Sequence, residues 1–569
     1  MNHANEAKNM KPIFKLQVDF ASINPAGGWT PMIRRPKRAP DSATPRLRSG
    51  GRPHSAIIRP RRAGRHWAAA EKNGLAGVIL SVLLLLVTQV DAGPFTVGPD
   101  YKRPTNAVPD AYKAAELGAW KEGQPLDHVP KGTWWQIFGD ATLNDLERRA
   151  TESNQELKAA IARVDQARAT ARVARSELLP GLDANPSWRR ERFSPNQVPN
   201  FGDITANTFR APLDLSYEID LWGRVRRGFE SARAEAAAGI AAFHNILLTL
   251  QSDVAQDYFA LRALDAEIAT IVSTVSLRNE QVQLVRSRFE GGIGNELDVA
   301  RAETELATAE AEAASLARRR AELEHALAIL VGENPAAFRL AALDSANTSW
   351  NPKPPAVPAG LPADLLERRP DVAEAERQLA AANARIGVAK AAFFPVLRLT
   401  GSGGYVSGDI DNLFNWESRI WSIGPSISLP IFAGGRNRAT YKRSQAAFDE
   451  AVAKYRQRIL VAFGEVEDNL AGLHYLSNQA AAQDRAVASA RRAAELATDR
   501  YRAGIVSYLE VVDANRATLQ TERANVQLAG QRLIAAIQLI KALGGGWSEQ
   551  QLVAHAAAPN SRRSIENLK

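Results

Sequence analysis

A run of apolar residues at every seventh position restricts the fold of this chain more than any other feature. Within Arg224 to Phe289, which contains no proline, these positions are Leu247, Val254, Leu261, Ile268, Val275, Val282 and Phe289. A heptad repeat held this long predicts one helix that packs a single seam against its neighbours in a left-handed supercoil. At about 1.5 Å per residue the helix is roughly 100 Å long, far longer than an ordinary globular helix.

The same pattern occurs again 212 residues further on, so the sequence predicts an internal duplication. The second set of apolar positions is Ile459, Val466, Leu473, Ala480 and Val487. The two repeats are expected at 134–350 and 363–547, with a proline-rich linker at 351–362 between them.

Each repeat is expected to contain its parts in the same order. A helix that ends at a proline comes first, followed by two strand-like segments, the heptad helix, and a returning helix that ends at a glycine. The first helices are expected at Ala141–Leu178 and Arg369–Phe393, and the returning helices at Glu296–Val331 and Tyr508–Leu543.

Three segments are expected before the first repeat. Residues 1–73 carry 15 Lys or Arg against 4 Asp or Glu, which is typical of a disordered basic leader; binding of nucleic acid or acidic lipid is the alternative. Residues 74–92 form an apolar stretch shorter than the ~20 residues that span a bilayer. They indicate a signal peptide, with an uncleaved membrane anchor as the alternative. Residues 93–133 are expected to be an extended arm, and residues 548–569 a C-terminal tail.

The composition excludes several kinds of chemistry. The net charge of +9 comes from the leader, because the rest of the chain holds 56 basic and 58 acidic residues, so no nucleic-acid footprint is supported there. The chain has no Cys, and its 8 His are scattered without metal-ligand spacing. No nucleophile motif or phosphate-binding loop is present. We therefore expect no metal, no cofactor and no catalytic site.

Alternating strands are the second strong signal. From Phe209 to Leu221 the odd positions are apolar and the even positions are mostly polar, and a similar pattern runs from Trp421 to Ile431; Leu397–Val406 and Asp183–Phe193 alternate more weakly. Such strands suit a soluble half-buried sheet or a membrane barrel. The signal peptide favours the barrel, in which several chains must contribute strands because four cannot enclose a channel. The lipid-facing residues would be Phe209, Leu213, Leu215, Tyr217, Trp421 and Ile423.

A group of acidic residues follows the glycine turn of each helical hairpin. Glu510 and Asp513 lie three residues apart on one face of the second returning helix, and Asp298 corresponds to Glu510 in the first repeat. At the end of a tube these acids would attract cations and narrow the mouth. The alternative is that they only favour the helix dipole.

Several short motifs are distributed along the chain. They are Val97-Gly98-Pro99-Asp100-Tyr101-Lys102-Arg103-Pro104, Trp134-Trp135 with Phe138-Gly139-Asp140, Asp220-Leu221-Trp222-Gly223-Arg224, Leu297-Asp298-Val299, Leu366-Glu367-Arg368-Arg369-Pro370-Asp371, Leu429-Pro430-Ile431-Phe432-Ala433-Gly434-Gly435-Arg436 and Leu509-Glu510-Val511-Val512-Asp513-Ala514. Together they resemble the outer-membrane efflux proteins, the TolC-like channel-tunnel superfamily, in its NodT-type branch of outer-membrane factors for resistance-nodulation-division pumps. The resemblance covers about Val97 to Trp547.

The resemblance implies a mainly α protein with a small β part. It would be a homotrimer in the outer membrane that extends into the periplasm, with a long-helix α-barrel and a shared twelve-stranded transmembrane β-barrel. Its function would be passive exit of small molecules, with an inner-membrane pump and a periplasmic adaptor as partners. Export of proteins or metal ions is the alternative. A non-membrane coiled-coil scaffold and an enzyme with a helical domain explain fewer of the features.

The resemblance also implies roles for residues near the hairpin tips. Leu509, Glu510 and Asp513 would form constricting rings, Asp298 would contact Tyr501 in the closed state, and the adaptor would touch Gly292, Leu297, Gly504 and Ser507. Two departures stand out. Val506 replaces an Arg that some relatives carry in the gate, and the absence of Cys excludes the lipid anchor usual in this branch.

Overall fold

The structure is a computed structural model that describes residues 95–105, 112–113, 132–193, 204–343, 350, 352–355, 357 and 368–546. All of them belong to the compact unit Ile79–Lys569, whereas the unit Met1–Val78 lies outside the described residues. The predicted leader (1–73), signal peptide (74–92) and C-terminal tail (548–569) also lie outside them, as do most of the arm and the linker.

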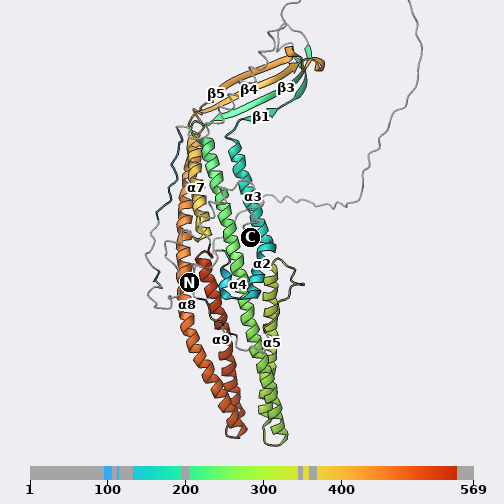
Figure 1. Ribbon diagram of the computed structural model, residues 1–569, viewed down its shortest axis with the longest axis vertical. Coiled ribbons are helices and arrows are strands. Elements are labelled where there is room, and N and C mark those ends of the chain that lie inside the picture. Colours follow the sequence, from blue (N-terminus) through green and yellow to red (C-terminus); the bar gives the residue numbers. More distant parts are fainter. Residues whose placement is uncertain are drawn as a thin grey trace, which may run out of the picture. The chain divides into compact units, whose positions relative to one another are not determined.

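Two pairs of long helices dominate the fold and confirm the duplication (Figure 1). Helix α4 (Arg224–Glu290) and helix α8 (Arg436–Arg502) contain 67 residues each. Each continues through a short turn into a helix of 35 residues, α5 (Glu296–Leu330) or α9 (Tyr508–Ala542). The first and last residues of α8 and α9 all follow those of α4 and α5 by 212 positions, as the sequence predicts.

The first helix of each repeat differs from the expectation in one case. In the second repeat a single helix, α7 (Pro370–Ala391), is present. In the first repeat the expected helix Ala141–Leu178 is two helices, α2 (Ala141–Ser153) and α3 (Gln155–Ser176), so the prediction of one helix is wrong. Asn154 separates them: its side-chain oxygen caps α3 at the amide of Leu157 (2.9 Å) and its amide donates to the Leu330 carbonyl (2.9 Å). Helix η3 (Trp134–Phe138) precedes α2.

The strands form one antiparallel sheet with the order β1-β3-β4-β5, and β2 pairs with β3 on the same edge as β1. Their bounds are β1 Gly181–Ala184, β2 Ser187–Phe193, β3 Ile204–Ile219, β4 Val396–Ser407 and β5 Arg419–Ser428. Three expected strands are corrected. The alternating segment Phe209–Leu221 is part of a strand that begins earlier, at Ile204, and ends at Ile219, so Leu221 lies outside it. The segment Asp183–Phe193 is interrupted at Asn185-Pro186, because proline cannot donate to a ladder, and β5 ends before Leu429 and Ile431. Helices η4 (Ile410–Asn412) and η5 (Trp416–Ser418) lie between β4 and β5.

The register places the expected apolar side chains on one face of the sheet. Leu213 lies opposite Gly403, which lies opposite Trp421 on the next strand. One row further along β3, Leu215, Gly401 and Ile423 are aligned in the same way. Because residues opposite each other point to the same side, this apolar face also carries Phe209 and Tyr217. The other face carries polar side chains, among them Asp214, Glu218, Ser402 and Ser426.

A compact junction connects the sheet to the helices and joins the two repeats. At the start of α4, Arg224 forms an ion pair with Glu218 at the end of β3 (2.7 Å). The indole of Trp222 donates to the Pro395 carbonyl (2.8 Å) and stacks on Phe394, with ring centroids 4.7 Å apart. Gly223 adopts φ 78°, and a side chain there would meet Thr96 at 2.7 Å. These contacts fix the direction in which the strands leave the helices.

The main hydrophobic core surrounds α4. It joins η3, α2 and α3 to α4 and α5 and includes the fully buried Leu143, Val254, Leu261 and Leu327. Of the heptad positions in α4, Val254, Leu261 and Val282 are buried, whereas Phe289 near the tip is 43% exposed. Among the helices that the structure describes, none is long and apolar enough to cross a membrane.

Candidate gate at the hairpin tips

The two hairpin tips have the same backbone turn. In each, a glycine with φ 75° (Gly292 or Gly504) follows the long helix. The amide of the next residue, Ile293 or Ile505, donates to a carbonyl five residues earlier, of Arg288 (2.9 Å) or Arg500 (2.9 Å). This is the Schellman arrangement, which satisfies the last carbonyls of a helix and requires the left-handed glycine. The sequence pairing of Gly292 with Gly504 therefore has a direct conformational cause.

Both turns expose apolar and small residues at their ends. Ile293 is 76% exposed and Ile505 is 66% exposed. In a Schellman turn an apolar residue at this position usually packs back on its own helix. Here both isoleucines point into solvent instead, beside the predicted adaptor contacts Gly292, Leu297, Gly504 and Ser507, all of which are exposed.

Tyr501, near the end of α8, is held by a residue of the other hairpin. The guanidinium of Arg288 on α4 lies over the Tyr501 ring, 4.7 Å from its centroid, and donates to the Tyr501 carbonyl (3.2 Å). Tyr501 is only 8% exposed and packs against Tyr508, with ring centroids 5.5 Å apart. Burial raises the pKa of Tyr501, the Arg288 cation opposes this effect, and the Asp298 carboxylate adds to it. Tyr501 is therefore a neutral hydrogen-bonding group at physiological pH.

An apolar cluster lies behind this contact. It contains Val282 and Val285 of α4, Ala302 of α5, and Val511 and Val512 of α9. Val506, at the position where the resemblance implied an Arg in some relatives, packs against this cluster. Burial also raises the pKa of Tyr508 to about 12. The tips of the two hairpins thus share one small core.

Glu305 forms a second connection between the hairpins. This residue of α5 is 7% exposed, and its carboxylate pairs with Arg278 of α4 (3.0 Å) and with Arg516 of α9 (2.9 Å to Nε). Arg278 also donates to the Glu305 backbone carbonyl (2.5 Å). Removing one partner of a buried ion pair destabilises a protein by several kcal/mol, because the other charge is left buried and unpaired. The pairing therefore resists separation of α9 from α4 and α5.

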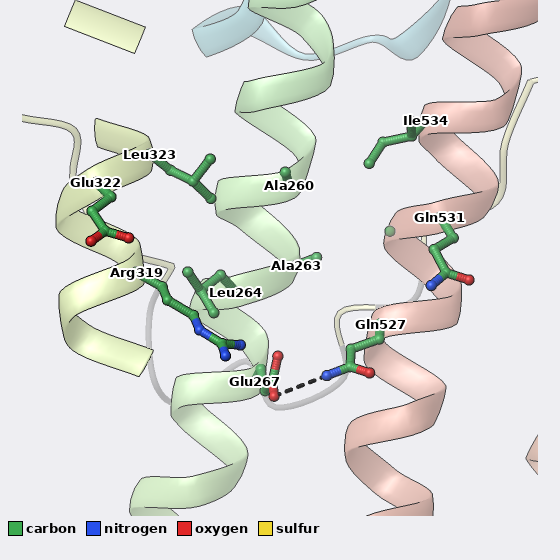
Figure 2. A pocket seen from close by; sticks show the side chains of 11 residues that line it. Ala260, Ala263, Leu264, Glu267, Arg319, Glu322, Leu323, Gln527, Gln531 and Ile534 are labelled. Carbon is green, nitrogen blue, oxygen red and sulfur yellow. Dashed lines mark hydrogen bonds between the residues drawn. The ribbon is translucent and has the colours of Figure 1, made fainter. Parts of the chain in front are cut away.

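A third connection lies one heptad further from the tip. Arg523 of α9 donates to Glu267 of α4 (2.9 and 2.6 Å) and pairs with Glu312 of α5. Gln527 donates to the same Glu267 (3.1 Å), as the dashed line in Figure 2 shows. Beside it a groove of about 510 Å³ lies between α5 and α9, with α4 as its floor (Figure 2).

Sequence reasoning did not identify these three connections. Arg516 and Arg523 are seven residues apart on α9, and their partners Glu305 and Glu312 are seven residues apart on α5. Complementary charges at heptad spacing on two helices of different hairpins are a signal that could have found this ladder. Arg288 carries no comparable pattern, because its role depends on the fold of both turns.

Of the predicted gate residues, Tyr501 takes part in the first of these connections, and the others lie around them. Leu509 is 42% exposed, and Glu510 and Asp513 are exposed on α9. Asp298 is close enough to affect the pKa of Tyr501, and its ion pair is with Arg301 of its own helix (3.5 Å). The closing contact between Asp298 and Tyr501 therefore stays a prediction. Within the described part of the chain, no group of three or more His, Asp or Glu could hold a metal ion.

The fold and the tips define a class of protein. In it a long helical hairpin is present in two copies, and both copies are joined to a small sheet with one apolar and one polar face. A family model described as outer membrane efflux protein matches residues 146–333 and 361–545. The chain belongs to this family, and the predicted resemblance is confirmed. It is an outer-membrane efflux protein that is located in the outer membrane and extends into the periplasm.

Individual relatives cover most of the chain. It is 35% identical to the solvent efflux pump outer membrane protein SrpC of Pseudomonas putida, over 80% of this chain and 96% of SrpC. It is 34% identical to the outer membrane protein OprJ of Pseudomonas aeruginosa, over 84% of this chain and 98% of OprJ. The solved structure of the outer-membrane channel OprN is similar with a TM-score of 0.73 and 31% identity, over 79% of this chain and 99% of OprN.

Proposed function

We propose that this protein is the exit duct of a tripartite efflux pump and conducts small molecules passively from the periplasm to the exterior. One observation carries the proposal: a sheet with one apolar and one polar face is joined to two long helical hairpins. Their tips expose acidic residues, and the hairpins are held together by the polar contacts of Arg288, Glu305 and Arg523. The similarity to SrpC, which is named for solvent efflux, supports small molecules as the cargo. Catalysis and cofactors have no part in the proposed function.

The two edges of the sheet support a barrel shared between copies. Strands β1 and β2 occupy one edge and β5 the other, and β4 and β5 contain 12 and 10 residues, close to the ~9–11 of a transmembrane strand. An open edge facing lipid leaves N–H and C=O groups without partners. Since β1 and β2 share one strand position, each chain supplies four positions, and a homotrimer closes a barrel of twelve strands. The apolar face then meets lipid and the polar face lines water.

The gate in this proposal is the second hairpin. Leu509, Glu510 and Asp513 of three copies form constricting rings, and the contact of Asp298 with Tyr501 supports the closed state. Opening moves the tips of α8 and α9 away from α4 and α5. This motion must break the Arg288 contact with Tyr501 and the pairings of Arg516 and Arg523. The periplasmic adaptor contacts the exposed tips and biases this equilibrium, and the inner-membrane pump delivers the cargo.

The test removes two groups of the gate together. We expect Asp513→Ala with Tyr501→Phe to increase the resting conductance of the protein in planar bilayers several-fold, because a ring of charge and a polar contact are lost at the mouth. The control is Asp484→Ala with Tyr475→Phe, which removes the same groups from exposed positions of α8 away from the tip. Equal conductance of the gate variant and the wild type would remove the gate assignment.

A further inference from the structure

The apolar face of the sheet carries charge at one end only. Within the strands that the structure describes, the register places three charged residues on this face, and all three are arginines: Arg190, Arg192 and Arg419. Arg190 and Arg192 lie on the same side of β2 as Trp188, which is opposite Phe209 of β3. Arg419 lies opposite Tyr405 and two residues before Trp421. No carboxylate shares this face in those strands.

The arginines lie at the end of the sheet away from the helices, as the order and direction of the strands require. Strand β2 runs away from α3 and reaches Arg190 and Arg192 in its last residues, while β5 begins with Arg419 and runs back toward α8. The helices extend into the periplasm, so this end of the sheet is on the exterior side of the membrane. Charged residues on an otherwise apolar face at this level require an anionic or aqueous environment.

Aromatic residues lie directly beside the arginines on the same face. Trp188 stacks on Phe209, with ring centroids 6.3 Å apart and planes 22° apart, and Tyr405 and Trp421 occupy the neighbouring strands. Aromatic bands of this kind mark the level of the lipid headgroups on membrane barrels. Arg419 therefore lies at the level of Tyr405, and Arg190 lies two residues beyond Trp188, at the exterior border of the headgroup band.

The two edges come together only in the proposed barrel, on which this inference rests. Arg190 and Arg192 are on the β2 edge, roughly 7 Å apart along the strand, and Arg419 is on the β5 edge. When β5 of one copy pairs with β2 of the next, neighbouring strands are about 4.8 Å apart. Arg419 of one copy then lies on the strand next to Arg190 and Arg192 of the next copy, on the same face and at the same end of the barrel.

We propose that these arginines bind the phosphate groups of an anionic lipid headgroup in the outer leaflet. A guanidinium offers paired donors that match a phosphate, and a site below the aromatic band can hold the acyl chains on Trp421 and Leu213. Glu191 is on the opposite face and pairs with Arg189 (3.1 Å), and Asp409, Asp411 and Glu417 are in the β4–β5 connection. Arg419 is anchored there by its Nε donation to the Trp416 carbonyl (2.9 Å).

The experiment uses the purified full-length protein in nanodiscs that contain diphosphoryl lipid A, dephosphorylated lipid A or phosphatidylethanolamine alone. Native mass spectrometry counts the lipids retained and gives the oligomeric mass in the same spectrum. We expect several-fold greater retention of diphosphoryl lipid A than of the dephosphorylated form. Arg190→Gln with Arg192→Gln should abolish this preference. Arg189→Gln with Arg210→Gln, which removes the same charge from the polar face of β2 and β3, should keep it.

The outcomes separate this inference from the proposed function. A trimer that retains both forms of lipid A equally overturns the lipid site and leaves the duct intact, whereas a monomeric mass overturns the shared barrel. If the β2 variant fails to fold, the comparison of the two lipid A forms on the wild type still decides the question. Displacement of diphosphoryl lipid A by millimolar inorganic phosphate would show a simple anion site and contradict recognition of a lipid.

Discussion

At the scale of the residue, Glu147 is the least expected feature of the core. It lies on α2 and is 0% exposed, and within the residues that the structure describes neither of its buried carboxylate oxygens has a hydrogen-bond partner. Burial therefore raises its pKa well above the usual value for glutamic acid. The side chain is kept in its neutral form at a cost to the folded state, because an unfolded chain ionises it freely in water.

Glu147→Leu should therefore stabilise the protein at neutral pH by about 1–3 kcal/mol, the usual penalty of an unsatisfied buried polar group. Since the folded-state pKa is raised, the stabilising effect should grow as the pH rises above the unfolded value. Thermal unfolding followed by tryptophan fluorescence at pH 5 and pH 8 measures this, with Glu152→Leu on the exposed side of α2 as the control. A lower melting temperature for Glu147→Leu at pH 8 would show that the carboxyl has a partner in the native protein.

Asp257 on α4 gives a second prediction of how the stability of the protein changes with pH. Burial, followed by the charge of Asp253, raises its pKa from 3.8 to about 6. The contribution of protonated Asp257 to stability is fully present at a pH below the pKa of the unfolded chain. It is lost as the pH rises through the pKa of the folded protein. We expect the melting temperature of the wild type to fall between about pH 4 and pH 6 more steeply than that of Asp257→Asn. The exposed Asp449→Asn serves as the control, and identical slopes for all three proteins would contradict the assignment.

At the scale of the element, the sequence predicts the long helices far better than the short ones. A heptad repeat and a glycine turn act within one stretch of chain, so the bounds of α4, α5, α8 and α9 follow from local pattern. The break at Asn154 depends on a hydrogen bond to Leu330, which is 176 positions away, and no local pattern contains it. Pro186 indicates the break between β1 and β2. The alternation within β2 is hard to recognise in the sequence because Arg189 and Arg190 follow Trp188.

The candidate gate shows the same limit. The sequence shows acidic residues after each glycine turn, and the shift of 212 residues shows that the two tips correspond to each other. The partners of Tyr501 and Glu305 were not, since each depends on which faces of two separate hairpins meet. The structure supplies that information through Arg288, Arg278 and Arg516.

At Gly530, helix α9 packs closely against helix α4. A Cβ atom at this position would lie 2.8 Å from the Cβ of Ala263 on α4, whereas a Cβ at Gly472 on α8 would meet nothing within 4 Å. In an unobstructed helix Gly→Ala stabilises by about 1 kcal/mol. We expect Gly472→Ala to raise the melting temperature and Gly530→Ala to lower it, because overpacking separates α9 from α4. A rise for both variants would mean that the two helices are further apart than the structure places them.

At the scale of the whole molecule, the absence of Cys makes the shared barrel directly testable. Side chains alternate between faces, so a cysteine on the polar face of β5 can reach only polar-face positions of the neighbouring copy. We expect Ser426→Cys to form disulfides between copies when combined with Cys at one of Asp183, Ser187 and Arg189, namely the position that the register between copies places opposite it. It should not do so with Cys at Leu182 or Trp188, which lie on the apolar face.

In the proposed barrel β5 of each copy pairs with β1 and β2 of the next, so one compatible pair should link all three chains into a ring. Non-reducing electrophoresis after mild oxidation should show a band of three chains, which collapses to a single chain on reduction. Each single-cysteine variant is the control and should give no band above two chains. Links that occur equally at polar-face and apolar-face positions would indicate random collision. Links absent from every pair would mean that these two edges do not meet, and the closed barrel of twelve strands would have to be abandoned.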